Sequence, residues 1–382
     1  MLDEDEVVAA ARAKVGLEDF RDESFREPLR VLLASLRDEA NLNEIGRATQ
    51  HARIVDSLAT RLSTEDYIRR HPEIEDEELG APVVIVGLMR TGSTMLQRLL
   101  GSGPAFQTAK WWEVRFPAPF PGSDWQREDP RIAAGRAEVA ATLEAVPVLA
   151  AVHPWDALAA DEEILLIEHS FLSWVPESSA NLPSYGAWLL AQDVTPAYRY
   201  LERQLQFLQW QKRRTGRPLG RWLLKSPFHL GYVDTLFEVF PGARVIQTHR
   251  DPIETIPSSA SMYRSLWELN ADGVDPVLVG TQVRDRLSWG LTRCMDARDR
   301  LPVDRFFDVD YRDMQSDPLA QAERIYAWLG VAMTPEAEQA MREWLADNAR
   351  GKRPRHEYTL SEFGYTEAGL AAHFARYRAR HL

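Results

Sequence analysis

A turn that contains an arginine joins an apolar run to an amphipathic helix early in the chain, and its residue types are those of a binding site. Residues 81–100 read APVVIVGLMRTGSTMLQRLL. Unpaired backbone N–H groups and the positive end of the helix dipole at such a turn favour a phosphate or a sulfate. The sequence therefore predicts an anion-binding loop. Its predicted binding residues are Arg90, Thr91, Gly92, Ser93 and Thr94.

The spacing of this loop bears on which anion it binds. Residues 87–94 follow the nucleotide-binding pattern G-x-x-x-x-G-K-[ST], but Ser93 occupies the lysine position and the basic residue comes earlier, at Arg90. ATP and GTP hydrolases with this loop use that lysine on the β- and γ-phosphates. Its absence argues against a triphosphate ligand.

Two further cationic side chains stand at the ends of predicted strands. Lys225 ends the β-rich run 221–225, and Arg250 follows the run 243–248. Ligands of open parallel sheets bind beyond the carboxyl ends of the strands, so Arg90, Lys225 and Arg250 are expected to meet at one edge. In a chain of net charge −12, such a cluster predicts a small ligand with several negative charges. Later candidates for the same ligand are Lys352, Arg353, Arg355 and His356.

The composition argues against several classes of function. A net charge of −12 over 382 residues does not suit nonspecific nucleic-acid binding, which needs a basic face. Cys294 is the only cysteine, so neither an intrachain disulfide nor a zinc site of several thiolates can form. The first residues lack the pattern of a secretory signal, and no run reaches the roughly 18 to 20 apolar residues of a membrane span. We expect a cytoplasmic protein without an integral membrane segment.

The pattern along the chain predicts an α/β fold, a P-loop-like parallel β-sheet flanked by helices with a helical extension before it. Residues 1–78 carry apolar positions at helical spacing and no chemical motif, so we interpret them as a helical extension packed on the core. Its surface makes a homodimer one expectation. Residues 79–382 form the α/β domain, with an aromatic-rich region at about 105–215 and a basic loop at 350–364.

Individual elements follow from periodicity and from turn residues. The predicted strands are 82–86, 221–225, 243–248 and 306–309. The predicted helices are 136–146, 161–174, 196–214, 318–329 and 334–348. Between them, the prolines and dense aromatics of 111–125 (WWEVRFPAPFPGSDW) predict an irregular segment that lines a site.

Several segments together resemble a known family. GLMRTGST, LLKSPFH, QTHRDPIETIPSS, DVDYRDMQSDP and GKRPRHEY, in this order and spacing, resemble the sulfotransferases that use 3′-phosphoadenosine 5′-phosphosulfate (PAPS). The resemblance covers about 82–363; it is strongest to the bacterial branch typified by mycobacterial sulfotransferases and more distant to the tyrosylprotein sulfotransferases. It implies that the loop from Arg90 to Thr94 holds the 5′-phosphosulfate and that Arg250 and Ser258 hold the 3′-phosphate.

The reaction implied by this resemblance moves a sulfuryl group from PAPS to a hydroxyl and releases adenosine 3′,5′-bisphosphate. Lys225 would stabilise charge on the leaving phosphate. No metal is expected, because the sequence shows no carboxylate pair suited to magnesium.

The general base of this reaction is left open by the sequence. Glu113 occupies a place similar to the catalytic glutamate of the tyrosylprotein enzymes and is slightly favoured. His229 follows Lys225 by four residues, where cytosolic sulfotransferases carry a catalytic histidine only two residues on. Glu162 and Glu163 resemble an acidic motif of the bacterial branch. A base must lie within hydrogen-bond reach of the acceptor hydroxyl.

The acceptor is predicted from aromatic residues. The aromatics between the donor motifs predict a wide apolar pocket for a lipid, sterol, polyketide or phenol. They are Trp111, Trp112, Phe116, Phe120, Trp125, Trp155, Phe171, Trp174, Tyr185 and Trp188. Two alternatives remain: a phosphoryl transferase that uses a P-loop, and a binding protein that retains a degenerate anion loop without turnover.

Overall fold

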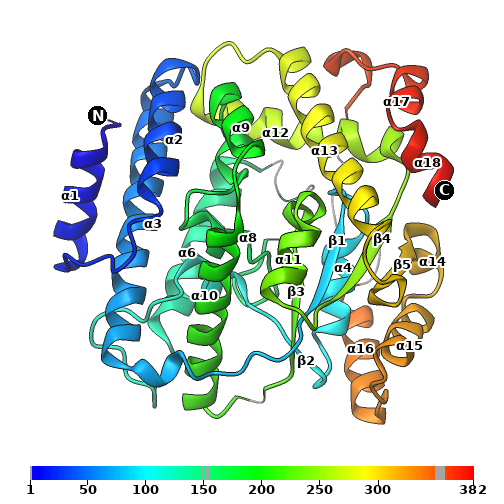
Figure 1. Cartoon of the computed structure of the whole chain (residues 1–382), viewed down its shortest axis with the longest axis horizontal. Coiled ribbons are helices and arrows are strands. Elements are labelled where there is room, and N and C mark those ends of the chain that lie inside the picture. Colours follow the sequence, from blue (N-terminus) through cyan, green and yellow to red (C-terminus); the bar gives the residue numbers. More distant parts are fainter. Residues whose placement is uncertain (1, 148–149, 151–154, 218, 349–357) are drawn as a thin grey trace.

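The computed structural model describes residues 2–382 except 148–149, 151–154, 218 and 349–357 (Figure 1). The predicted ligand-binding residues Lys352, Arg353, Arg355 and His356 lie outside the described residues, as does much of the predicted basic loop. No described helix is both long enough and apolar enough to cross a membrane.

In the described part of the chain, five parallel strands form one sheet in the order β2-β3-β1-β4-β5. The four predicted strands are confirmed to within one residue at each end; β2 was not predicted, because two residues carry no periodic pattern. In register, Ile85 lies opposite Lys225 and Gly87 lies opposite Thr248, so the carboxyl ends meet at one edge. The strands are β1 (Val83–Gly87), β2 (Phe106–Gln107), β3 (Arg221–Lys225), β4 (Arg244–His249) and β5 (Phe306–Asp310).

Helices cover both faces of this sheet. Val83 and Ile85 of β1 pack into one apolar cluster, whereas Val84 and Val86 pack into another. This alternation follows from the two-residue period of a strand, and burial on both faces explains the continuous apolar run. The first cluster contains α4 (Ser93–Leu100), α15 (Pro318–Leu329) and α16 (Pro335–Asp347); the second contains α10 (Thr195–Arg214), α11 (Val233–Val239) and α13 (Pro276–Arg298).

The N-terminal helices lie on the side of the molecule away from β5 (Figure 1). They are α1 (Glu4–Val15), α2 (Arg26–Asp38) and α3 (Glu44–Arg70), and α3 packs against α12 (Pro252–Asn270) and α10. Within the described residues, the further α-helices are α5 (Trp111–Arg115), α6 (Pro130–Ala145), α8 (Ile164–Glu168), α9 (Pro183–Leu190), α14 (Tyr311–Ser316), α17 (Glu367–His373) and α18 (Ala375–His381). Short 3₁₀ turns are η1 (Pro72–Ile74), η2 (Val175–Ser178), η3 (Pro227–Gly231), η4 (Val303–Arg305) and η5 (Ser361–Phe363).

The middle of the chain differs from the prediction. The segment 111–125, predicted as irregular, begins with the helix α5, because the first of its prolines is Pro117 and the Glu113 carboxylate accepts a hydrogen bond from the Lys110 N–H. The helix predicted at 161–174 is only α8, since Phe171 takes a left-handed backbone conformation with φ of 57°. The helix α6 begins six residues before the predicted Arg136, where Asp129 caps it and Pro130 is its first residue.

Candidate active site

The anion loop is a tightly packed turn between β1 and α4. Arg90 has φ of 70° and Gly92 has φ of 83°. A Cβ added at Gly87 would lie 2.3 Å from Thr248 Oγ1, and one at Gly92 would lie 2.6 Å from Met314 Cε. Gly87 is therefore required by close approach as well as by backbone conformation, whereas Gly92 is required mainly by its backbone conformation, because the end of the Met314 side chain can move. They place the N-terminus of α4 at the edge of the sheet.

The hydroxyls of this loop divide into two roles. Thr91 is fully buried; its Oγ1 donates to the Leu88 carbonyl at 2.7 Å and lies 2.6 Å from Thr248 Oγ1. The Thr91 side chain therefore ties the loop to β4 and leaves only its backbone for a ligand. Ser93 and Thr94, by contrast, line a large cavity together with Arg90 and Gly92.

Lys225 ends β3 directly beside this loop. Its side chain is 1% exposed, and Nζ lies 3.1 Å from Thr94 Oγ1 and 2.5 Å from Glu162 Oε1. The buried ammonium thus joins the anion loop to a carboxylate that lies on the cavity wall and is 23% exposed. A cation and a carboxylate meet at the point where the loop would hold an anion.

Arg250 also meets the loop, because its Nη1 donates to the Arg90 carbonyl at 3.0 Å. Its Nε and Nη2 bond Glu254 Oε2 at 3.1 and 2.6 Å, and its guanidinium lies 4.2 Å from the centre of the Tyr311 ring. Arg250 and Tyr311 are on the cavity wall, whereas the buried Ser258 is not. The structure therefore brings Arg90, Lys225 and Arg250 together but does not bring Ser258 into the cavity lining.

Glu113, the favoured base, is placed away from these groups. It is 3% exposed, is not part of the cavity wall, and bonds Lys212 Nζ at 2.8 Å through both oxygens and Arg217 Nη1 at 3.0 Å. Burial acts to raise the pKa of Glu113, but Lys212 and these other donors hold it below its ordinary value. This sealed ion pair does not favour a role as a base for a substrate in the cavity.

His229 and Glu163 form a second buried group. His229 is 0% exposed and has both ring nitrogens occupied, Nδ1 at 2.6 Å from the Tyr198 hydroxyl and Nε2 at 2.6 Å from Glu163 Oε1. The other oxygen of Glu163 accepts the backbone N–H of Lys225 at 2.9 Å. Neither side chain lines the cavity. His229 and Glu163 therefore hold the end of β3 in place, because Glu163 binds the backbone of Lys225.

A cavity of about 960 Å³ extends from the anion loop to the N-terminal helices. Its apolar wall includes Trp111, Trp155 and Trp174 of the ten predicted aromatics. The other seven do not line it: Phe171 and Tyr185 are core residues, for example, and Trp125 packs edge-on against Trp210. Sequence periodicity could not separate these cases, because which ring faces the cavity depends on packing.

Two elements contribute wall residues that the sequence reasoning missed. The helix α12 supplies Met262, Tyr263, Leu266 and Leu269, and α3 supplies Thr49, Gln50, Ala52, Arg53, Asp56 and Ser57. The N-terminal extension therefore does more than pack on the core, contrary to its interpretation as packing or oligomer surface. No motif in α3 could have shown this. Tyr311, in contrast, directly follows β5, so the strand-end rule applied above could have found it.

The α3 side of the cavity carries charges that compensate one another. The Arg53 guanidinium bonds the Glu168 carboxylate, and Arg115 Nε bonds Glu138 at 2.6 Å while its Nη2 lies 3.7 Å from Asp56. His169 also lies on this wall, and burial, with help from Arg115 and Arg61, lowers its pKa to about 3. His169 is thus neutral at pH 7. The charged side chains at this end of the cavity are paired with side chains of opposite charge.

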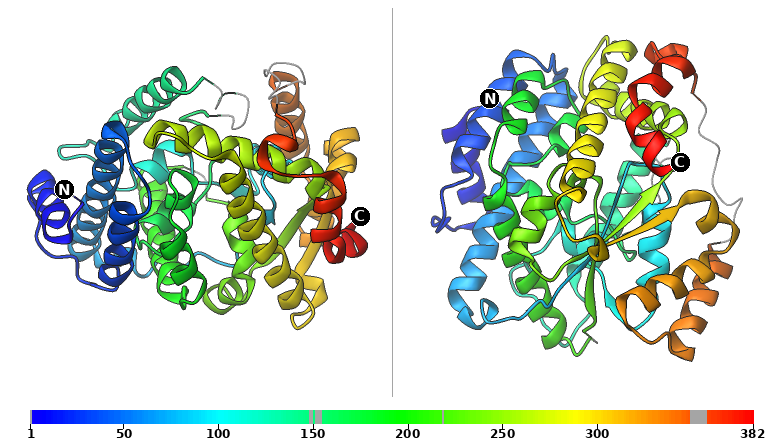
Figure 2. Two further views of the ribbon diagram at one scale, coloured as in Figure 1. Left: turned by 90° about the horizontal axis from the view of Figure 1, so that it is seen from above. Right: turned by 45° about the vertical axis from the view of Figure 1, so that its right-hand side comes forward.

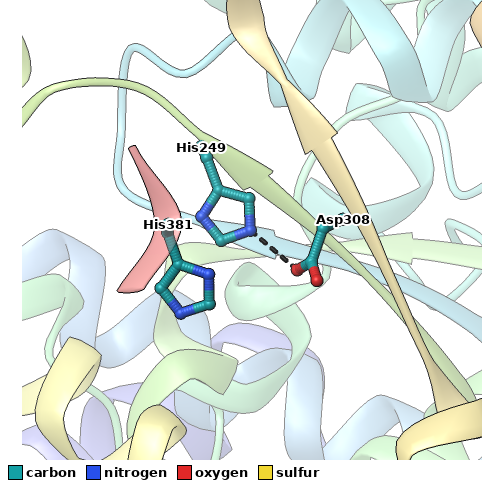
Figure 3. A group of neighbouring side chains, drawn as sticks. All are labelled: His249, Asp308 and His381. Carbon is teal, nitrogen blue, oxygen red and sulfur yellow. Dashed lines mark hydrogen bonds and ion pairs between the residues drawn. The ribbon is translucent and has the colours of Figure 1, made fainter. Parts of the chain in front are cut away.

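A further polar cluster joins His249, the last residue of β4, to Asp308 of β5 and His381 of α18 (Figure 3). His249 Nε2 lies 2.8 Å from Asp308 Oδ1, and the His381 ring stacks on the His249 ring at 4.4 Å. Both oxygens of Asp308 also bond Arg298, at 2.6 and 2.8 Å. The Asp308 oxygens are thus already occupied by hydrogen-bond donors, and the cluster braces the strand that carries Arg250.

The fold and the loop at its edge are those of enzymes that transfer sulfuryl groups. Residues 82–335 match the sulfotransferase family, and the chain belongs to it. The omega-hydroxy-beta-dihydromenaquinone-9 sulfotransferase Stf3 of Mycobacterium bovis and Mycobacterium tuberculosis is 26% identical over 294 residues, which cover 74% of this chain and 71% of the relative.

Two solved structures are similar over nearly the whole chain. The sulfotransferase STF1 of Mycobacterium tuberculosis has a TM-score of 0.86 at 32% identity, covering 98% of both chains. STF9 of Mycobacterium avium has a TM-score of 0.88 at 30% identity, covering 100% of this chain and 97% of that one. The predicted sulfotransferase fold is thereby confirmed, including its N-terminal helices.

Proposed function

We propose that this sulfotransferase moves the sulfuryl group of PAPS to a hydroxyl of a largely apolar acceptor bound in the cavity. The observation that carries the proposal is the position of Lys225 Nζ, 3.1 Å from Thr94 of the anion loop and 2.5 Å from Glu162 on the cavity wall. A stabilising cation and a proton-accepting carboxylate thus stand at one point of the site. This pair is what an in-line transfer from a phosphosulfate to a hydroxyl requires.

The roles of the residues follow from the bonds that change. The acceptor oxygen bonds to sulfur while the bond from sulfur to the phosphate oxygen breaks, and the released electron pair stays on adenosine 3′,5′-bisphosphate. Lys225 and the N–H groups of the loop would stabilise this new charge. Glu162 would take the proton of the acceptor hydroxyl. Glu163 would position Lys225 through the backbone N–H that it binds.

The choice of Glu162 over the other candidate bases rests on access. Glu162 lines the cavity, whereas Glu113 and His229 are buried outside its wall and already hold other partners. The favoured choice made from the sequence, Glu113, is accordingly replaced in this proposal. Arg250, on the cavity wall, would bind the 3′-phosphate of the donor, and a contribution from Ser258, Lys352 or Arg353 stays a prediction.

The acceptor class is supported by the walls of the cavity. Tryptophan, methionine and leucine side chains from α5, α8 and α12 supply a long apolar surface, which suits a lipid, sterol, polyketide or phenol. The charged groups near α3 are paired with one another, and such pairing favours an uncharged acceptor. The relative Stf3 is named for a hydroxylated menaquinone, an acceptor of this kind.

Turnover with labelled PAPS tests the reaction. We expect a sulfated product from a panel of hydroxylated quinones, sterols and phenols, and no product with the variant Lys225→Met. No product from any acceptor, with PAPS bound, would favour a binding protein over an enzyme.

Ligand-dependent stability tests the donor separately. Adenosine 3′,5′-bisphosphate at 100 times its Kd should stabilise the native state by about 2.7 kcal/mol, while AMP should do so less at the same concentration. Greater stabilisation by ATP with magnesium would instead support the phosphoryl transferase.

A further inference from the structure

We propose that the C-terminal helix α18 positions Arg250 for recognition of the 3′-phosphate of the donor, through Tyr377 and Arg378. The inference rests on the proposed function, because it takes Arg250 as the ligand of that phosphate. It adds two positioning residues that lie outside residues 82–335, the part of the chain matched by the sulfotransferase family. Figure 2 shows α18 beside the carboxyl ends of β4 and β5.

The two residues that flank Arg250 are both held by this one helix. The Tyr377 hydroxyl lies 2.9 Å from His249 Nδ1. Arg378 donates to Asp251 Oδ2 from Nη2 at 3.0 Å and from Nε at 3.3 Å. The backbone on both sides of Arg250 is therefore fixed by polar contacts from a helix more than 120 residues further along the chain.

The hydrogen bonds form a directed chain. Burial raises the pKa of Tyr377, so its hydroxyl stays protonated and can donate to His249 Nδ1. His249 then donates from Nε2 to Asp308 (Figure 3). Arg298 holds Asp308 in turn. Every polar atom along this path has a partner, which makes the path rigid.

The side chain of Arg250 rests on the Arg90 carbonyl and the Tyr311 ring, and its charge is paired with Glu254. Glu254, which bonds two of its nitrogens, is 57% exposed, so the pair contributes little and an incoming phosphate can displace it. Bidentate recognition of a phosphate depends on the orientation of the guanidinium fork. The contacts from α18 to His249 and Asp251 contribute to that orientation, because they fix the chain on both sides of Arg250.

Affinity for two nucleotides separates positioning from general stability. Isothermal titration calorimetry at constant salt would compare adenosine 3′,5′-bisphosphate with AMP, which lacks the 3′-phosphate. We expect Tyr377→Phe and Arg378→Met to weaken binding of the bisphosphate by about five- to tenfold, the effect of one or two lost hydrogen bonds, and to leave the affinity for AMP unchanged. Arg376→Met is the matched control, because this residue of the same helix pairs with Asp296 and Asp299 and should change neither affinity.

A double-mutant cycle then tests whether the effect acts through Arg250. In an Arg250→Met background, Tyr377→Phe should cause no further loss of bisphosphate affinity. An additive loss, or an equal loss for AMP, would overturn the positioning role and assign α18 a general structural one. Wild-type protein that does not prefer the bisphosphate over AMP would instead overturn the proposed donor, so the two failures are distinguishable.

Discussion

Two glutamate–lysine pairs in this protein have the same chemistry and opposite surroundings. Glu113 and Lys212 are 3% and 7% exposed and lie outside the cavity wall. Glu162 and Lys225 are 23% and 1% exposed, and Glu162 lies on the cavity wall, where it contacts the buried Lys225 beside the anion loop. The first pair is closed off by its surroundings, whereas the second lies where the proposed function needs a base and a cation.

The electrostatics of the sealed pair agree with a structural role. Burial lowers the pKa of Lys212, and Glu113 opposes this effect. Each group needs the other because an isolated charge in this position would be strongly unfavourable. The pair at the cavity differs in the proposed mechanism. There the Glu162 carboxylate exchanges its contact with Lys225 for a contact with the acceptor hydroxyl.

The largest expected effect comes from breaking the sealed pair. Glu113→Gln should lower the free energy of unfolding by about 3 to 5 kcal/mol, because it leaves the buried Lys212 without its counter-charge. Urea unfolding measures this loss. The double variant Glu113→Leu with Lys212→Met should recover part of the stability, and the kcat of folded Glu113→Gln protein should stay near that of the wild type. A hundredfold loss of kcat in folded Glu113→Gln protein would restore Glu113 as the base.

Removing the cation at the cavity should act on turnover instead. We expect Lys225→Met to reduce kcat by about 100- to 1,000-fold, because charge on the leaving phosphate loses its stabilising ammonium. Steady-state kinetics with PAPS measures this effect. Unchanged turnover in Lys225→Met would show that the contact with Thr94 is only structural.

The carboxylate of the same pair should have a smaller effect. Glu162→Gln should reduce kcat by about 100-fold, because the amide cannot accept the acceptor proton. Its KM for PAPS should change little. The control is Glu202→Gln, which removes an exposed carboxylate that pairs with Arg199 on α10. Equal activity of the two variants would count against Glu162 as the base.

The smallest expected effect is the change in the free energy of unfolding when the pH is lowered. The pKa of His169 is about 3 in the folded protein and about 6.5 when unfolded, so the unfolded state binds the proton more tightly. The stability contributed by neutral His169 is complete above pH 6.5 and is lost as the pH falls toward 3, by at most about 1.4 kcal/mol per pH unit. The contribution of Glu113, whose pKa is lowered in the folded protein, is complete above its ordinary pKa of 4.5 and is lost only as the pH falls below that value.

Urea unfolding at pH 7 and pH 5 measures this difference in stability. The variant His169→Gln should show a shallower decline than the wild type, and Glu113→Gln should keep the decline of the wild type over this interval. An identical decline in wild type and His169→Gln would show that His169 is not the group responsible.

Much of the donor side of the site was predictable because its determinants are local. The run from Val83 to Gly87 is apolar on both faces, which marks a buried parallel strand, and the topology of such sheets brings strand ends to one edge. Arg90, Lys225 and Arg250 could therefore be assigned to one place without any knowledge of the packing. The glycines belong to the same local pattern, because Gly87 packs closely against Thr248 and Gly92 has a positive φ in the turn.

The acceptor side could not be predicted in the same way. Glu113 and Glu162 both lie in short acidic or aromatic segments, and nothing in their spacing shows that Lys212 covers the first and Lys225 meets the second. The short helices α5 and α8 also carry too few residues for a reliable periodic pattern.

The sequence alone determined the parallel sheet, the anion loop and the basic residues at the strand ends, because strand period, glycine positions and strand-end topology are properties of short segments. Only the tertiary structure decided which carboxylate faces the cavity and which tryptophans line it. It also decided that α3 lines the cavity and that α18 contacts the residues beside Arg250. The physical reason is that these contacts join segments far apart in the chain, and the packing of helices against one another orients their side chains.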